Sequence, residues 1–83
     1  MKQIIFPPHA QQQMIERGAS KEEIIDAIHN GERLYVKYSR TAYRKNFQYN
    51  KIWGKKFYHI KQVMPIVKEE KSIVVITVYT FYF

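Results

Sequence analysis

The chain has 83 residues, no cysteine, and 14 lysine and arginine residues against 7 acidic ones, which gives a net charge of +7. This length allows one small domain, over residues 1–83, and the lack of cysteine excludes disulfides and thiolate metal sites. The N-terminal apolar run is too short for a signal peptide, and no stretch reaches the ~18 apolar residues of a membrane span. The sequence therefore predicts a cytoplasmic protein without a membrane segment.

The positive charge is concentrated in the later part of the chain. Residues 1–31 carry three basic and four acidic side chains, a net charge of −1, whereas residues 32–83 carry eleven basic and three acidic ones, a net charge of +8. A one-sided basic surface is typical of a protein that meets a polyanion, such as RNA, DNA, an acidic protein or a membrane surface. The alternative is that the excess lysine only keeps a small protein soluble.

Two helices are expected, over residues 8–17 and 21–30, because each range has one apolar face and local signals at its ends. The signals are Pro8 in the first turn of the first helix, a capping box of Ser20 and Glu23 before the second, and Gly18 and Asn30-Gly31 as left-handed ends of the two helices. Both helices are therefore bounded by local chemistry.

The rest of the chain predicts a sheet. Strands are expected over residues 34–39, 42–49, 55–67 and 72–83, joined by turns at 39–41, 50–54 and 68–71. Such short turns favour antiparallel hairpins, and the unbroken apolar run of the last strand favours a central position. Pro65 marks an edge, a bulge or a strand end. Residues 2–6 are either a first strand or an extended lead-in. The predicted fold is α+β, with two N-terminal helices on a four-stranded antiparallel sheet.

One spaced pattern covers most of the chain. Residues 9–23 read H-A, six residues, then R-G-x-S-x-E-E, and N-G-E follows at 30–32; Y-H-I at 58–60 and I-T-V-Y at 76–79 continue the pattern in the sheet. This pattern resembles a small family of bacterial domains of unknown function, which is itself similar to RelE/BrnT-type toxins and to the barnase–colicin–RelE (BECR) ribonuclease fold. The resemblance implies a toxin of a toxin–antitoxin system that cleaves RNA without a metal.

The residues are compatible with that chemistry. Metal-free RNA cleavage needs a base for the 2′-hydroxyl, an acid for the departing 5′-oxygen and cations for the phosphate. No metal-binding or nucleotide-binding motif is present, so no cofactor is expected. The candidate catalytic residues are His9, Arg17, His59, Thr77 and Tyr79.

Each candidate also has a structural explanation. His9 could be a surface residue at a helix start, and His59 could be a hydrogen-bonded core residue. Arg17 lies eight residues from His9, ~12 Å along a helix, so it serves the same phosphate only if it reaches back; otherwise it ties the helix end to the sheet. Thr77 and Tyr79 are ordinary strand residues.

Basic and aromatic residues alternate between residues 33 and 57, as expected for a surface that binds phosphates and stacks on bases. The candidate phosphate-binding residues are Arg40, Arg44, Lys45, Lys55 and Lys56, with Trp53 in an exposed loop as the stacking residue. The alternative is that about half of these aromatic residues form the core.

The predicted function is a metal-independent endoribonuclease whose partners are RNA, including ribosome-associated messenger RNA, and an acidic antitoxin. Two alternatives stay open, a non-catalytic RNA- or DNA-binding module and a basic protein-interaction domain. The aromatic terminus at residues 80–83 could also pair edge to edge in a homodimer.

Overall fold

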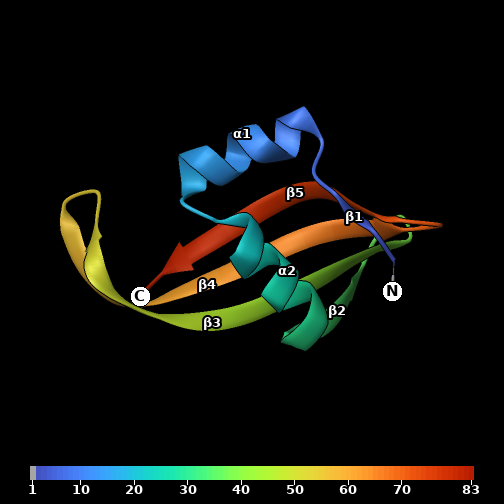
Figure 1. The fold of residues 1–83 in the computed structure, drawn as a ribbon. Coiled ribbons are helices and arrows are strands. Elements are labelled where there is room, and N and C mark those ends of the chain that lie inside the picture. The colour runs from blue at the N-terminus through green and yellow to red at the C-terminus, as the bar shows by residue number, and fades with distance from the viewer. Residues whose placement is uncertain (1) are drawn as a thin grey trace.

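The computed structural model describes residues 2–83 as two helices packed on one face of a sheet (Figure 1). The elements in chain order are β1 (Ile4–Ile5), α1 (Pro8–Arg17), α2 (Lys21–Asn30), β2 (Glu32–Val36), β3 (Arg40–Trp53), β4 (Lys56–Glu69) and β5 (Ile73–Tyr82). Helix α1 lies along β5, and α2 lies across β4 and β3 (Figure 1). Neither helix is long and apolar enough to cross a membrane.

The sheet has five strands in the order β1-β5-β4-β3-β2 and is mixed, so the predicted four-stranded antiparallel sheet is wrong. Strand β1 runs parallel to β5, with Ile4 opposite Ile73, and the Ile73 N–H extends the pairing to the Gln3 carbonyl at 2.8 Å. A strand of two residues is too short to produce a sequence pattern by which it could be predicted. The middle strand of the five is β4 rather than β5. Strand β5 lies close to an edge, because β1 pairs with only its first two residues. The α+β class itself is correct.

The helix bounds agree with the sequence. The Ser20 N–H donates to Glu23 Oε1 at 3.0 Å, and the Glu23 N–H donates to Ser20 Oγ at 3.1 Å, which completes the expected capping box. Gly18 ends α1 at φ 76°. Gly31 ends α2 differently, because its φ is −83° rather than positive. A Cβ there would lie 2.4 Å from the Ala27 carbonyl oxygen, so close backbone approach is what favours glycine.

The hairpins differ from expectation in position and length. The turn between β2 and β3 covers residues 37–39, where Tyr38 and Ser39 have positive φ, and therefore begins two residues before the predicted turn. Strands β3 and β4 continue to a two-residue turn at Gly54 and Lys55, so residues 50–53 are strand rather than turn. The turn-forming residue Asn50, at φ 50°, instead lies in an irregularity of the β3–β4 register. The register of β4 also shifts directly after Pro65 and Ile66.

The core lies between the helices and the sheet. It contains buried residues of both helices, of the joint between them, and of β4 and β5: Ala10, Met14, Ala19, Ile24, Ile28, Val63, Val67, Ile73, Val75 and Val78. Tyr43 and Phe47 of β3 pack against it, whereas Asn46 and Gln48 are exposed, as expected for a strand whose successive side chains point to opposite faces. Both helices therefore cover the same face, and the other face of the sheet carries no helix.

Candidate functional site

Side chains of α1 cover the free edge of β5. The edge beyond β1 leaves backbone groups of β5 without a strand partner. At Val78 the N–H donates to Gln13 Oε1 at 3.1 Å, and the carbonyl accepts from Arg17 Nη1 at 2.5 Å. The Thr77 hydroxyl also donates to Gln13 Oε1. An unpaired strand edge is a template for aggregation, and here one turn of helix side chains takes the place of the missing strand.

Four of the five predicted catalytic residues meet along this edge, and we call His9, Gln13, Arg17, Thr77 and Tyr79 the edge cluster. The first three lie four residues apart on α1, so they form one stripe on the helix. Because Gln13 Oε1 accepts from β5, its Nε2 faces His9 Nε2 at 3.1 Å. The guanidinium carbon of Arg17 lies 5.2 Å from the centre of the Tyr79 ring, within the range of a cation–π contact.

The orientation of Gln13 fixes the assigned tautomer of His9. An amide nitrogen only donates hydrogen bonds, so the Gln13 Nε2 proton is donated to His9 Nε2, and the ring proton of neutral His9 is then on Nδ1. His9 is exposed. The imidazole therefore presents an N–H to solvent from a position held by Gln13. Gln13 was not among the residues predicted from the sequence, although its place midway between His9 and Arg17 on one helix stripe was a usable signal.

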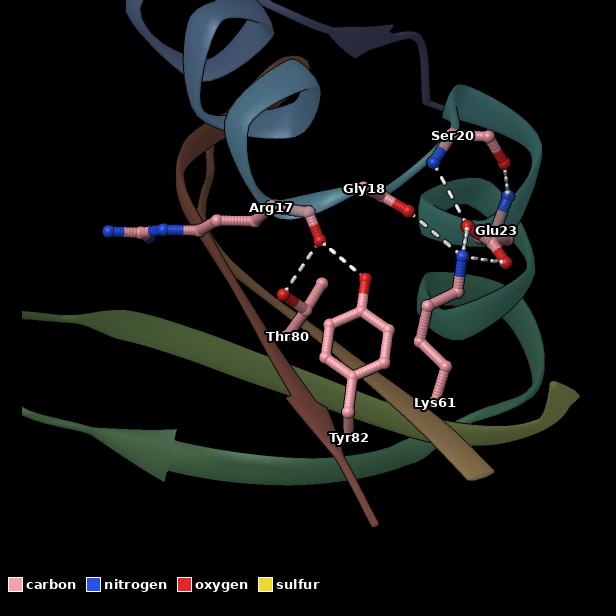
Figure 2. Close-up of polar contacts among 7 residues, drawn as sticks. All are labelled: Arg17, Gly18, Ser20, Glu23, Lys61, Thr80 and Tyr82. Atoms are coloured by element: carbon pink, nitrogen blue, oxygen red, sulfur yellow. Dashed lines mark hydrogen bonds and ion pairs between the residues drawn. The ribbon is translucent and has the colours of Figure 1, made fainter. Parts of the chain in front are cut away.

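Arg17 is held at two points. Its carbonyl accepts from the Thr80 hydroxyl at 2.9 Å and the Tyr82 hydroxyl at 2.7 Å, while its side chain extends in the opposite direction (Figure 2). Burial raises the pKa of Tyr82 to about 12, so the hydroxyl stays protonated and able to donate. These contacts explain how the end of α1 is tied to β5.

The joint between the helices is held by Lys61 of β4. Lys61 Nζ donates to the Gly18 carbonyl at 2.9 Å and pairs with Glu23 Oε2 at 2.7 Å, beside the capping box (Figure 2). Only 9% of the Lys61 side chain is exposed, and a buried ammonium without such partners would be costly. Lys61 is therefore a structural residue that orients α1, and with it the edge cluster.

His59 lies apart from the edge cluster. The N–H groups of His59 and Ile60 both donate to the Phe83 carbonyl, so His59 is opposite the far end of β5. Tyr79 lies four residues before Phe83, ~13 Å along a strand. The exposed His59 ring is 3.2 Å from Asn50 Oδ1 through Nδ1 and packs edge-on against Phe57. The structure therefore does not bring the two predicted histidines to one phosphate.

The predicted phosphate-binding residues do not form one site. Arg44 pairs with Glu32 at 2.5 Å, and Lys45 pairs with Asp26 of α2 at 2.7 Å, where the hydrogen bond from Lys45 holds the pKa of Asp26 below its usual value. Arg40 begins β3, whereas Lys55 and Lys56 follow its last residue, ~40 Å away at about 3.3 Å per residue.

Trp53 is not in an exposed loop. It is the last residue of β3, is half-buried, and stacks on Tyr82 with ring centres 4.8 Å apart and planes within 11°. A Cβ on Gly18 would come within 2.7 Å of the Trp53 ring. Trp53 therefore packs under the joint between the helices, and its ring face is occupied by Tyr82 rather than open to a base.

Most of the chain matches one described family. A family model described as a domain of unknown function (DUF4258) matches residues 6–80. The chain belongs to this family. No curated protein and no solved structure matches the chain. The match confirms membership in an uncharacterised domain family, and it includes both helices and the whole edge cluster. The family match does not extend to RelE or BrnT toxins, so a relationship of this DUF4258 domain to them stays a proposal.

Proposed function

We propose that this DUF4258 domain is a metal-independent endoribonuclease, similar to RelE/BrnT toxins, and that the edge cluster is its reacting site. The observation that supports the proposal is that Arg17 reaches back to Val78, the same residue whose N–H binds Gln13. The Arg17 side chain therefore spans part of the ~12 Å along the helix that separates Arg17 from His9. A proton donor and a phosphate-binding cation then border one place on β5.

The reaction can be assigned to these groups. His9 Nε2 bears the lone pair of the neutral imidazole and takes the proton of the RNA 2′-hydroxyl in place of its hydrogen bond from Gln13, while Arg17 stabilises the negative charge that develops on the phosphate. The 2′-oxygen then attacks phosphorus, forming a 2′,3′-cyclic phosphate as the bond to the 5′-oxygen breaks. The Tyr79 hydroxyl, on a side chain that is 41% exposed, gives its proton to the departing 5′-oxygen, and the adjacent Arg17 stabilises the phenolate until the imidazolium of His9 returns a proton to it. Arg17 has guanidinium N–H groups besides Nη1 to hold the phosphate, and Gln13 and Thr77 position His9.

The proposal is tested by RNA cleavage with purified protein and a metal chelator. Single-stranded RNA and ribosome-bound messenger RNA are compared for wild type, His9→Ala, Tyr79→Phe and, as a matched control, His29→Ala, since His29 is exposed on α2. His9→Ala and Tyr79→Phe should each slow cleavage at least about 100-fold, the usual loss when a proton-transfer group is removed, while His29→Ala keeps wild-type rates. Cleavage that needs metal, or that survives both substitutions, would remove the edge cluster as its site.

A second candidate function is RNA binding without cleavage. It is favoured by the hydrogen bonds of the Thr77 hydroxyl and of Arg17 Nη1, which give both residues a structural role at the edge of β5. This function predicts an affinity that falls steeply with salt and no cleavage products.

The proposal also names a partner and a location. The net charge of +8 on residues 32–83 is complementary to an acidic antitoxin, and both proteins would act in the cytoplasm. A short acidic protein encoded beside this one, which binds it and blocks cleavage, is the expected finding. Binding of that protein by a chain that neither binds nor cuts RNA would instead favour a protein-interaction domain.

A further inference from the structure

The sheet face opposite the helices is uncovered and carries aromatic side chains. Along β5, Val78 is in the core, and the Thr80 and Tyr82 hydroxyls bind α1. By alternation, Tyr79 and Phe81 point to the other face, where 41% and 45% of their surfaces are exposed. We call this surface the open face. It borders the edge cluster, because Tyr79 belongs to both.

A row of polar groups lies beside Phe81 on the open face. The strand register places Asn46 of β3 opposite Gln62 of β4, and Gln62 opposite Phe81 of β5. Gln62 Nε2 donates to Asn46 Oδ1 at 2.9 Å, which joins the two amides. This bond leaves Gln62 Oε1 as an acceptor on the strand next to Phe81 and Asn46 Nδ2 as a donor one strand further on. An aromatic platform with amide groups at its side is suited to a nucleobase.

The sheet half of the chain is basic, and exposed cations of its turns lie at both ends of the open face, whereas Arg33, Lys51 and Lys56 are opposite Tyr43, Tyr58 and Trp53 and so lie on the helix side. All three carboxylates of residues 32–83 already have partners, since Glu32 pairs with Arg44, Glu69 accepts from the Tyr43 hydroxyl, and Glu70 pairs with Lys68. The exposed cations of the sheet and its turns, for which residues 2–83 show no carboxylate partner, are Arg33, Lys37, Arg40, Lys51, Lys55, Lys56 and Lys71. A second copy of this basic half would be repelled, whereas the phosphates of a nucleic acid would be attracted.

We propose that a single strand of RNA lies across the open face, with one base stacked on Phe81 and a neighbouring base on Tyr79. The Asn46–Gln62 amide pair hydrogen-bonds the edge of the base on Phe81 and so gives the site a base preference. Bases in a duplex are stacked on each other and cannot reach a protein ring, so double-stranded RNA does not fit. This inference deepens the proposed function by naming the state of its substrate and a specificity site next to the edge cluster.

The stacking is tested by affinity for a short single-stranded RNA with 2′-O-methyl groups, which cannot form the attacking oxygen. Binding is measured with chelator present for wild type, Phe81→Leu and two matched controls. The controls are Tyr35→Leu in β2 and Tyr38→Leu in the β2–β3 turn, where the tyrosines are 82% and 84% exposed. Phe81→Leu should weaken binding about tenfold, the usual loss for one base stack, and the controls by less than about twofold. Circular dichroism checks that each variant is folded.

The base preference is tested with four homopolymer oligonucleotides and the variant Gln62→Leu. Wild type should prefer one base at least about fivefold, and Gln62→Leu should remove this difference while retaining most of the affinity. A duplex of the same length should bind at least about tenfold more weakly than the single strand. An equal affinity for duplex, or an effect of Phe81→Leu no larger than that of Tyr35→Leu, would overturn the inference. So would a solution dimer that Phe81→Leu dissociates, because the face would then be covered by a second copy.

The outcomes separate this inference from the proposed ribonuclease. Single-strand binding that needs Phe81, with no cleavage of natural RNA, leaves the open face as the binding site and removes the enzyme. Cleavage that needs His9 and Tyr79 but is insensitive to Phe81→Leu leaves the enzyme and removes the stacking site.

Discussion

At the scale of single residues, Tyr82 joins the end of α1 to the sheet through a hydrogen bond that only its protonated form can donate. Burial raises its pKa to about 12, from the ordinary value of 10 that it has in the unfolded chain. A group whose pKa is higher in the folded state than in the unfolded state stabilises the fold fully at pH values below its unfolded pKa. This stabilisation is lost as the pH rises through the folded pKa. We therefore expect the free energy of unfolding to fall between pH 10 and pH 12.

The variant Tyr82→Phe cannot ionise at this position, so its free energy of unfolding should fall less steeply over this range. At pH 7 it should be about 1 kcal/mol less stable than wild type, because the hydrogen bond to the Arg17 carbonyl is lost. Urea unfolding followed by circular dichroism at each pH gives both values. Tyr43 also has a raised pKa, caused first by burial, so a residual slope in Tyr82→Phe is assigned with Tyr43→Phe. Parallel curves for wild type and Tyr82→Phe would contradict the prediction.

Gly18 and Gly54 have similar backbone conformations but different surroundings, so substitution of each one distinguishes backbone strain from overpacking. Gly18 has φ 76° and Gly54 has φ 66°, both in the left-handed region. A Cβ on Gly18 would lie 2.7 Å from the Trp53 ring and the Tyr82 hydroxyl oxygen, whereas a Cβ on Gly54 would meet nothing within 4 Å. Gly54→Ala should cost about 1 kcal/mol from backbone strain alone, and Gly18→Ala about 2–3 kcal/mol, because overpacking adds to the strain. Thermal and urea unfolding compare the two, and equal losses would show that Trp53 and Tyr82 move aside.

At the scale of elements, α1 acts as a cover for the edge of β5, and Gln13 is the residue that carries this function. Gln13→Leu removes the acceptor for the Val78 N–H and for the Thr77 hydroxyl. We expect a loss of about 1–2 kcal/mol in the free energy of unfolding and greater self-association, because the strand edge becomes free to pair. Gln12→Leu is the matched control, since Gln12 is exposed on the same helix. Urea unfolding and sedimentation velocity measure the two effects, and identical behaviour of both variants would refute the edge-cover role.

The elements differ in how far the sequence could predict them. Both helices are bounded by signals within a few residues, such as the Ser20–Glu23 capping box, so their bounds were predicted correctly. Strand β1 is held only by pairing to Ile73 and Val74, some 70 residues along the chain, and two residues carry no periodic pattern. Asn50 resembled a turn residue, although its positive φ serves a strand irregularity. Pairing between distant segments therefore decided the sheet, and local chemistry decided the helices.

The candidate site shows the same division. The spacing of His9 and Arg17 on one helix was visible in the sequence, but their meeting with Thr77 and Val78 depends on contacts across more than 60 residues. The position of Trp53 was misread because aromatic residues near a glycine are typical of exposed turns, whereas Tyr82, from the far end of the chain, covers its ring. Phe81 was noted in the sequence only as part of the aromatic terminus and Gln62 not at all, because only the strand register makes them neighbours.

At the scale of the whole molecule, charge is divided between two layers. The helix layer carries Glu16, Glu22, Glu23 and Asp26, while most of the basic residues lie on the sheet and its turns. Because β3 spans most of the length of the molecule, the basic residues of the sheet gather at two distant ends. Lys55 and Lys56 lie at the tip of the β3–β4 hairpin, and Arg33 and Lys37 lie near the β2–β3 turn. An RNA chain on the open face therefore meets different cations according to its length.

This separation predicts a dependence of the salt effect on RNA length. The hairpin tip lies only a few residues beyond His59, which is opposite the end of β5, so a short single strand stacked on Phe81 extends toward Lys55 and Lys56. Lys55→Gln with Lys56→Gln should weaken binding of a six-nucleotide RNA and reduce the slope of log affinity against log salt by about 1.4, since each of the two lost phosphate contacts removes roughly 0.7.

Arg33→Gln with Lys37→Gln removes the same charge at the other end and is the matched control. For the six-nucleotide RNA, this pair should change the affinity by less than about twofold and leave the salt slope unchanged. For a strand several times longer, both pairs of substitutions should reduce the salt slope. Fluorescence anisotropy over a range of potassium chloride concentrations measures the slopes. Equal effects of the two pairs on the short RNA would mean that binding follows net charge alone, and a larger effect of the Arg33 and Lys37 pair would place the strand at the opposite end of the sheet.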